Sequence, residues 1–77
     1  MTTREKIYTI AIEHHWRETV YSSEQVLQIE RGSELLSIGL LPNDGGLGRV
    51  LHSSSVGWSR PVTGLPSILA IVRKRPE

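Results

Sequence analysis

Two adjacent histidines, His14 and His15, are the residues of this chain that look most suited to chemistry. They lie in the stretch IEHHWRE (residues 12–18), where two glutamates, an arginine and a tryptophan surround them. Imidazole groups bind metal ions and exchange protons near neutral pH, so this pair could form a metal site or an acid–base pair. Either chemistry requires both rings to reach one point in space, which depends on the element that carries them.

The sequence around the histidines predicts a β-strand. From Lys6 to Trp16, apolar and aromatic residues recur at every second position, and a period of two over this length is typical of a half-buried strand. Because neighbouring side chains on a strand point to opposite faces, we expect His14 to face the core and His15 to face solvent. His52 is the only other histidine. We therefore expect no metal site, no cofactor and no catalytic residue at this pair.

Two structures compete for the segment around Gly32. Ser22 followed by Gln25 fits a capping box, and a helix over residues 23–31 would give an α+β, β-grasp-like layout. The alternative is a β-hairpin with a type II′ turn at Gly32-Ser33. Counting outward from that turn pairs Arg31 with Glu34, Ile29 with Leu36, Gln28 with Ser37, and Leu27 with Ile38. Because opposite charges meet and apolar residues meet, we favour the hairpin.

Strands and turns are also predicted for the rest of the chain. Residues 17–22 favour a turn and a return strand, and residues 42–46 (PNDGG) favour a tight turn before a strand at residues 47–52. Residues 67–72 (SILAIV) form a continuous apolar run, which predicts a strand covered on both faces. Such a strand lies either in the centre of the sheet or against a second copy of the chain. On this basis we expect a homo-oligomer.

A long loop at residues 53–66 carries Trp58 and Arg60 among serines, glycines and prolines. Loops of this length in a small domain are often functional, and tryptophan and arginine are favoured at the centres of protein interfaces. A second interpretation makes Trp58 a lid over a core that contains no phenylalanine. The basic tail at residues 73–77 adds Arg73, Lys74 and Arg75 as candidate contacts for an acidic partner.

Composition limits the classes of protein to which this chain can belong. Its 77 residues predict a single small domain, and 38% hydrophobic with 22% charged residues indicate a folded chain. With no cysteine, and no apolar run near the roughly 20 residues that cross a membrane, we expect a soluble, cytoplasmic protein without membrane contact. The net charge of +1 is uneven, since residues 1–38 carry four basic and six acidic residues, and residues 39–77 carry five and two.

Together these patterns predict a mainly β domain, a small antiparallel sheet or partly open barrel of five to six strands. No carboxylate pair, nucleophile–base pair or metal-ligand set has the spacing that catalysis needs, so we expect no enzyme. We expect a protein–protein interaction or inhibitor module, such as an accessory or phage-type protein docking on a larger complex. The residues expected to contact that partner are Trp58, Arg60, Arg73, Lys74 and Arg75.

A nucleic-acid-binding protein is the alternative function. In that case Trp16 or Trp58 would stack on bases, and the basic residues of the second half would contact phosphates, namely Arg49, Arg60, Arg73, Lys74 and Arg75. The small net charge argues against this class, because dedicated nucleic-acid-binding domains are usually much more basic.

Overall fold

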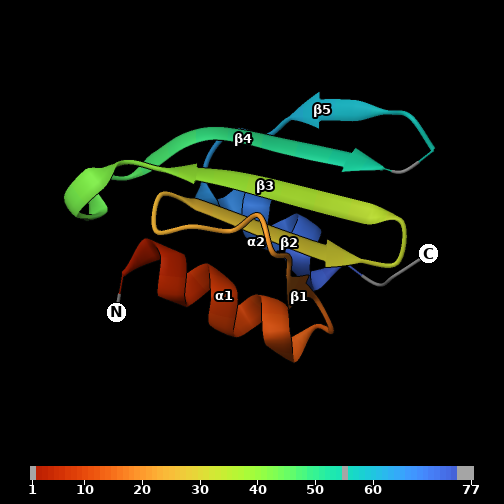
Figure 1. The fold of residues 1–77 in the computed structure, drawn as a ribbon, viewed down its shortest axis with the longest axis horizontal. Helices are drawn as coiled ribbons and strands as arrows, with labels where there is room; N and C mark the ends of the chain where they lie inside the picture. Colours follow the sequence, from red (N-terminus) through yellow and green to blue (C-terminus); the bar gives the residue numbers. More distant parts are fainter. Residues whose placement is uncertain (1, 55, 75–77) are drawn as a thin grey trace.

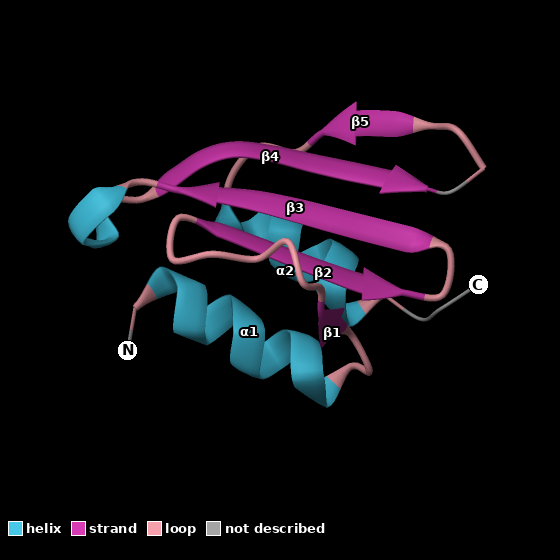
Figure 2. Ribbon diagram, viewed as in Figure 1, coloured by secondary structure: helices cyan, strands magenta, loops and turns pink. Residues whose placement is uncertain are grey.

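The computed structural model describes residues 2–54 and 56–74, which form a five-stranded antiparallel sheet with two helices on one face (Figure 1). The elements are α1 (Thr3–Glu13), β1 (Arg17–Glu18), β2 (Val26–Arg31), β3 (Glu34–Leu40), the 3-10 turn η1 (Pro42–Asp44), β4 (Leu47–Ser54), β5 (Ser59–Pro61) and α2 (Leu65–Arg73). The strands are arranged in the sheet in their sequence order (Figure 2). The predicted five-stranded antiparallel sheet is therefore confirmed, in its open form.

The hairpin predicted at Gly32-Ser33 is confirmed. β2 and β3 pair in the predicted register, with Arg31 opposite Glu34 and Ile29 opposite Leu36. Gly32 has a φ of 61°, and Ser33 is not among the residues with positive φ, as a type II′ turn requires. A helix over residues 23–31 is wrong, because Val26–Arg31 form strand β2, in which every second residue is buried on the helix-covered face.

The strand predicted from Lys6 to Trp16 is wrong, since residues 3–13 form helix α1. The buried residues of α1 are Ile7 and Ala11, four positions apart on one face, while Tyr8 and Ile12 are 37% and 45% exposed. Two of the alternating residues are therefore surface residues of a helix. A capping-box signature at residues 2–5 (TTRE) does predict this helix, and the Thr2 side chain accepts a hydrogen bond from the Glu5 N–H at 3.1 Å.

His14 and His15 close the C-terminal end of α1. The N–H of His15 donates to the carbonyl of Ile12 at 3.2 Å, and the N–H of Trp16 donates to the carbonyl of Ala11 at 3.0 Å. These two bonds define a Schellman motif, which places His15 in the left-handed region with a φ of 70°. His14 is half-buried and His15 exposed, as expected, but the helix cap separates them rather than strand alternation.

Residues 65–73 form helix α2, so the strand predicted at residues 67–72 is wrong. Ile68 and Val72 are fully buried, and Leu65 and Leu69 pack against the same core. This i, i+3, i+4, i+7 spacing gives a helix one apolar face. Pairing with a second copy through a strand at this position is wrong for the same reason. Self-association by another surface stays a prediction.

The segment at residues 53–66 is not one long loop. β4 continues to Ser54, β5 occupies Ser59–Pro61, and α2 begins at Leu65, which leaves two short connections. The turn predicted at residues 42–46 contains η1, and the strand predicted at residues 47–52 is the major part of β4, so both are confirmed. Within residues 17–22 only Arg17–Glu18 is a strand, and a turn follows it.

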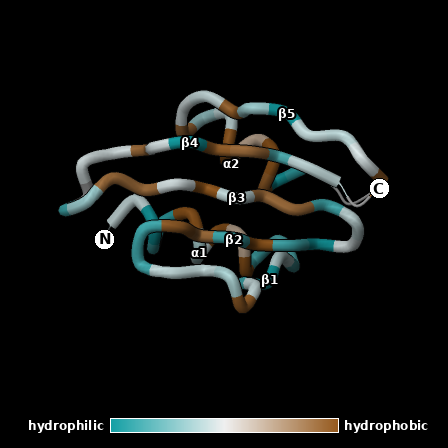
Figure 3. The backbone as a smooth tube through the Cα atoms, turned by 45° about the horizontal axis from the view of Figure 1, so that its top comes forward, coloured by the Kyte–Doolittle hydropathy of each residue, from teal (hydrophilic) through white to brown (hydrophobic). Residues whose placement is uncertain are grey.

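The core lies between the helices and one face of the sheet. It consists of Ile7, Ala11, Trp16, Leu27, Ile29, Leu36, Ile38, Val50, Ile68 and Val72. Hydrophobic residues, brown in Figure 3, recur along β2, β3 and β4, and alternate ones face the helices. No helix of the described residues is long and apolar enough to cross a membrane.

Candidate interaction site around Trp58 and His52

Arg31 joins the C-terminal ends of both helices to the end of β2. Its side chain is only 6% exposed, and its guanidinium donates to the carbonyl of His14 at 3.0 Å and to that of Lys74 at 2.7 Å. The last carbonyl groups of a helix have no partner within the helix, and a cation also interacts favourably with the negative end of the helix dipole. Arg31 therefore supplies hydrogen-bond donors to the C-terminal ends of both helices.

Trp16 packs beneath Arg31 and is 2% exposed. The guanidinium carbon of Arg31 lies 4.6 Å from the centre of the Trp16 ring, and the indole Nε1 donates to the carbonyl of Val72 at 3.0 Å. Because the ring is buried and its one donor is used, stacking of Trp16 on a nucleic-acid base is excluded in this fold. Of the two tryptophans, only Trp58 is available to a partner.

Glu34 and His52 continue this cluster across the sheet. Cross-strand pairing places Glu34 opposite Arg31 and His52 opposite Leu36, all on the helix-covered face. The Glu34 carboxylate lies 3.7 Å from the Arg31 guanidinium and 4.0 Å from His52 Nε2, and the side chains of Glu34 and His52 are 14% and 15% exposed. His52 Nε2 itself is buried and makes no hydrogen bond.

Burial lowers the pKa of His52 below its ordinary value of 6.5. The nearby Glu34 carboxylate raises this pKa, but the positive charges of Lys74 and Arg60 lower it further. His52 is consequently a neutral imidazole at pH 7. Burial of the neutral ring beside Trp58 avoids the cost of removing a charged imidazolium from water.

Trp58 and Arg60 lie on the outer side of His52. The Trp58 ring meets the His52 ring edge to face at a centroid distance of 4.7 Å, and the Arg60 guanidinium stands 5.3 Å from the centre of the Trp58 ring. Trp58 is half-buried and does not belong to the core cluster. It therefore covers His52 rather than the core, and part of its ring stays open to a partner.

The fold brings three of the five predicted contact residues together. Trp58, Arg60 and Lys74 surround His52, and we call these three residues the Trp58 surface. Arg73 is exposed in the last turn of α2, directly before Lys74, while Arg75 lies outside the described residues. Arg49, the additional arginine of the nucleic-acid alternative, points away from this site, because its position in β4 alternates with that of His52.

Sequence reasoning missed the three residues that support the Trp58 surface. Arg31 and Glu34 were recognised as a cross-strand pair, but the pairing of β3 with β4, which adds His52, was not predicted. The carbonyl partners of Arg31 come from the ends of two helices that were predicted as strands. Only a signal for those helices, such as the capping box of α1, could have revealed the cluster.

Surface hollows also lie outside the Trp58 surface. One, of about 770 Å³, is open, has a mixed polar and apolar lining, and lies beside the N-terminal end of α1, next to Glu5, Glu24 and Leu41. The second, of about 500 Å³, lies beside β1. Within the described part of the chain, no three His, Cys, Asp or Glu side chains are placed to hold a metal ion.

The Trp58 surface offers an aromatic face and the Arg60 guanidinium to an acidic ligand, and Lys74 adds positive charge close by. Arg and Lys side chains form their strongest hydrogen bonds with ionised oxygens, and an aromatic ring beside them adds apolar contact area. Comparison with known protein families, with curated proteins and with solved structures finds no match for this chain.

Proposed function

We propose that this protein is a non-enzymatic protein-binding module that docks on an acidic segment of a larger complex through the Trp58 surface. The observation that carries the proposal is the stacking of Arg60 over the half-buried Trp58, 5.3 Å from its ring centre. Tryptophan and arginine dominate binding energy at protein interfaces, most of all where neighbouring groups hold them in place. Here His52 supports Trp58 from below.

Charge supports an acidic partner. Arg60 and Lys74 both lie close enough to His52 to lower its pKa, so their positive charges act at one place. The Glu34 carboxylate on the inner side of His52 is 14% exposed and faces Arg31, so it screens the outer cations only in part. A partner carboxylate at the Trp58 surface would therefore meet an attractive field, which accelerates association and selects against basic partners.

A nucleic acid is the competing ligand, because the open part of the Trp58 ring could stack on a base while Arg60 contacts a phosphate. Arg49 and Arg60 lie on opposite faces of the sheet, so the basic residues do not form one continuous track. Proteins that bind single strands without sequence preference follow the backbone along a positive groove. The arrangement thus favours a compact acidic protein site.

The test measures binding of a labelled glutamate-rich peptide containing one leucine, and of a single-stranded oligonucleotide of equal charge, by fluorescence anisotropy. We expect the peptide to bind more tightly, and Arg60→Glu to weaken it about tenfold, which corresponds to about 1.4 kcal/mol. Arg49→Glu is the matched control, since it makes the same charge change at an exposed arginine on the other face. The affinity of Arg49→Glu for the peptide should stay within about twofold of that of the parent chain.

Two results would contradict the proposal. If Arg49→Glu weakens peptide binding as much as Arg60→Glu does, the affinity depends on the net charge of the protein and not on the Trp58 surface. If the oligonucleotide binds more tightly than the peptide and Trp58→Ala abolishes that binding, the nucleic-acid alternative is correct. Circular dichroism should verify that all variants keep the helix and sheet content of the parent chain.

A further inference from the structure

Val20 and Tyr21 expose more apolar surface than adjacent residues normally do. Val20 is 91% exposed and Tyr21 77% exposed, on the turn that follows β1. Single exposed apolar residues need no explanation, whereas contiguous exposed apolar surface is a feature of interaction sites. Both residues lie at the opposite edge of the sheet from Trp58, since β1 and β5 are its two edge strands.

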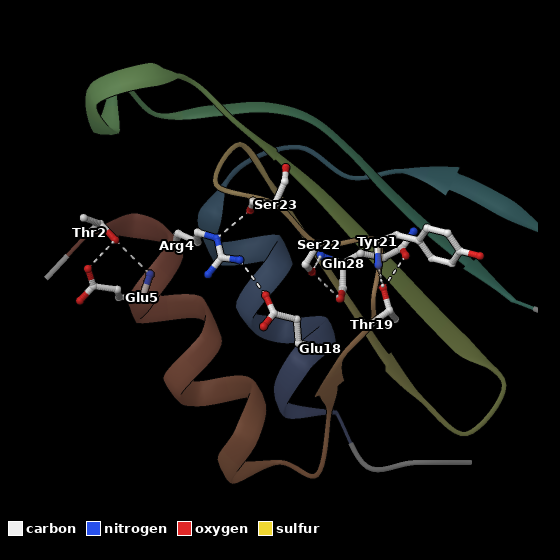
Figure 4. A network of polar contacts seen from close by, with 9 residues as sticks. All are labelled: Thr2, Arg4, Glu5, Glu18, Thr19, Tyr21, Ser22, Ser23 and Gln28. Atoms are coloured by element: carbon white, nitrogen blue, oxygen red, sulfur yellow. Dashed lines mark hydrogen bonds and ion pairs between the residues drawn. The ribbon is translucent and has the colours of Figure 1, made fainter.

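This turn is held rigidly by hydrogen bonds from its polar residues (Figure 4). The Thr19 hydroxyl donates to the Gln28 side chain at 2.6 Å, and the Thr19 N–H donates to the Gln28 carbonyl at 2.9 Å. The Ser22 hydroxyl donates to the same carbonyl at 3.0 Å and accepts from the Gln28 N–H at 2.7 Å. Because the turn is already ordered, little conformational entropy is lost when it binds.

Arg4 connects the turn to helix α1. Its guanidinium donates to the carbonyl of Ser23 at 3.2 Å and pairs with the Glu18 carboxylate at 2.7 Å (Figure 4). Arg17, on the same short strand, pairs with Glu30 at 2.9 Å. The carboxylates of Glu18 and Glu30 are therefore neutralised, which lowers the charge repulsion between two such surfaces.

A groove of about 500 Å³ lies directly beside the projecting side chains. Its lining includes Val20 and Tyr21 themselves together with Leu35, Gln28, Glu30 and Arg17. Its volume falls within the range of about 300–1,000 Å³ that small-ligand sites occupy, so it can accept a tyrosine and a valine side chain. A projection and a groove of matching size thus adjoin on one surface.

We propose that this surface binds a second copy of the chain, each copy placing Val20 and Tyr21 in the groove of the other. A two-fold interface uses the same patch on both partners, and a projection beside a matching groove meets that requirement. The other edge strand, β5, contains Pro61, which has no N–H to donate, so β5 is poorly suited to pairing with a strand of a second copy.

The area involved sets the strength of this dimer. A fully covered tyrosine buries about 150–250 Å². Reciprocal docking covers two projections and two grooves, which gives about 1,000 Å² in total, near the lower limit for a specific interface. We therefore expect a weak, concentration-dependent dimer. Such a dimer carries two Trp58 surfaces on one particle, which raises the avidity for a repetitive acidic partner.

The test is light scattering on the purified chain over a concentration series reaching the millimolar range. The parent chain should rise from the mass of one chain towards that of two, and Val20→Asp should stay at one. Val56→Asp is the matched control, because Val56 is 80% exposed on the β4–β5 loop and receives the same substitution. It should dimerise like the parent chain.

Three outcomes would overturn the inference. The parent chain could keep the mass of one chain at every concentration, or Val20→Asp could dimerise as strongly as the parent chain. Val56→Asp could also lose dimerisation to the same extent as Val20→Asp. A second variant, Leu35→Glu, changes the groove instead of the projection and should also prevent dimerisation. No acidic partner is needed, so the result is independent of the function proposed for the Trp58 surface.

Discussion

At the scale of single residues, burial affects the pKa of His52 more strongly than the opposite charge beside it does. The Glu34 carboxylate lies 4.0 Å from His52 Nε2 and would by itself raise the pKa of His52. Burial has the larger effect, and Lys74 and Arg60 act in the same direction, so the pKa of His52 in the folded protein lies below 6.5. The unfolded chain therefore takes up a proton at a higher pH than the folded protein does.

This difference predicts a pH dependence of stability. The contribution of neutral His52 is fully present above pH 6.5 and is lost as the pH falls from there through the lower pKa of the folded protein. Urea unfolding of the parent chain should accordingly show a free energy of unfolding that decreases as the pH falls below 6.5. His52→Gln should remove most of that decrease. If the free energy of unfolding falls with pH equally in His52→Gln and in the parent chain, the assignment to His52 is contradicted. His15→Gln is the control and should keep the pH dependence of the parent chain.

At the scale of elements, the C-terminal cap of α1 requires a conformation that its residue does not favour. His15 adopts a φ of 70°, where the side chain of an L-residue is strained and glycine is not. We expect His15→Gly to stabilise the protein by about 0.5–1 kcal/mol, because it relieves this strain while keeping the Schellman hydrogen bonds. Chemical denaturation followed by circular dichroism measures the change.

The neighbouring histidine provides the control for that substitution. His14 has a φ of −103°, which any residue adopts without strain, so His14→Gly should only add freedom to the unfolded chain. It should destabilise the protein by about 0.5–1 kcal/mol. The cap assignment fails if the two glycine variants change stability in the same direction.

At the scale of the whole molecule, the sheet and both helices share one core and should unfold together. Ile68 of α2 is fully buried against residues of α1 and of the sheet. Ile68→Ala should cost about 2–5 kcal/mol, a large part of the roughly 5–15 kcal/mol that stabilises a small domain. Ser67→Ala, at the adjacent exposed position, should change stability by less than about 0.5 kcal/mol.

Thermal unfolding followed by two signals tests the shared core directly. In Ile68→Ala, the loss of helix and the loss of Trp16 burial should occur at one lowered midpoint, since Trp16 contacts the last turn of α2 through Val72. A helix signal that disappears well before the tryptophan signal would mean that α2 is a separately unfolding element.

The middle of the chain was predictable because its pairing is local. The β2–β3 hairpin depends on complementary residues on either side of Gly32, and β4 follows a turn whose residues prefer that conformation. Of the candidate site, Trp58, Arg60 and Lys74 were predicted from residue type alone. Arg31, Glu34 and His52 were not, because the register of three strands and the ends of two helices bring them together.

The sequence by itself determined the class of sheet, the hairpin register and the basic character of the second half of the chain. The tertiary structure decided the conformation of both terminal segments. Residues 6–16 alternate like a strand only because Tyr8 and Ile12 are apolar at exposed positions, and residues 67–72 are apolar on nearly every side. The apolar residues of such short segments fit both the strand period of two and the helix period of about 3.6 residues. Packing against one shared face of the sheet selects the helix.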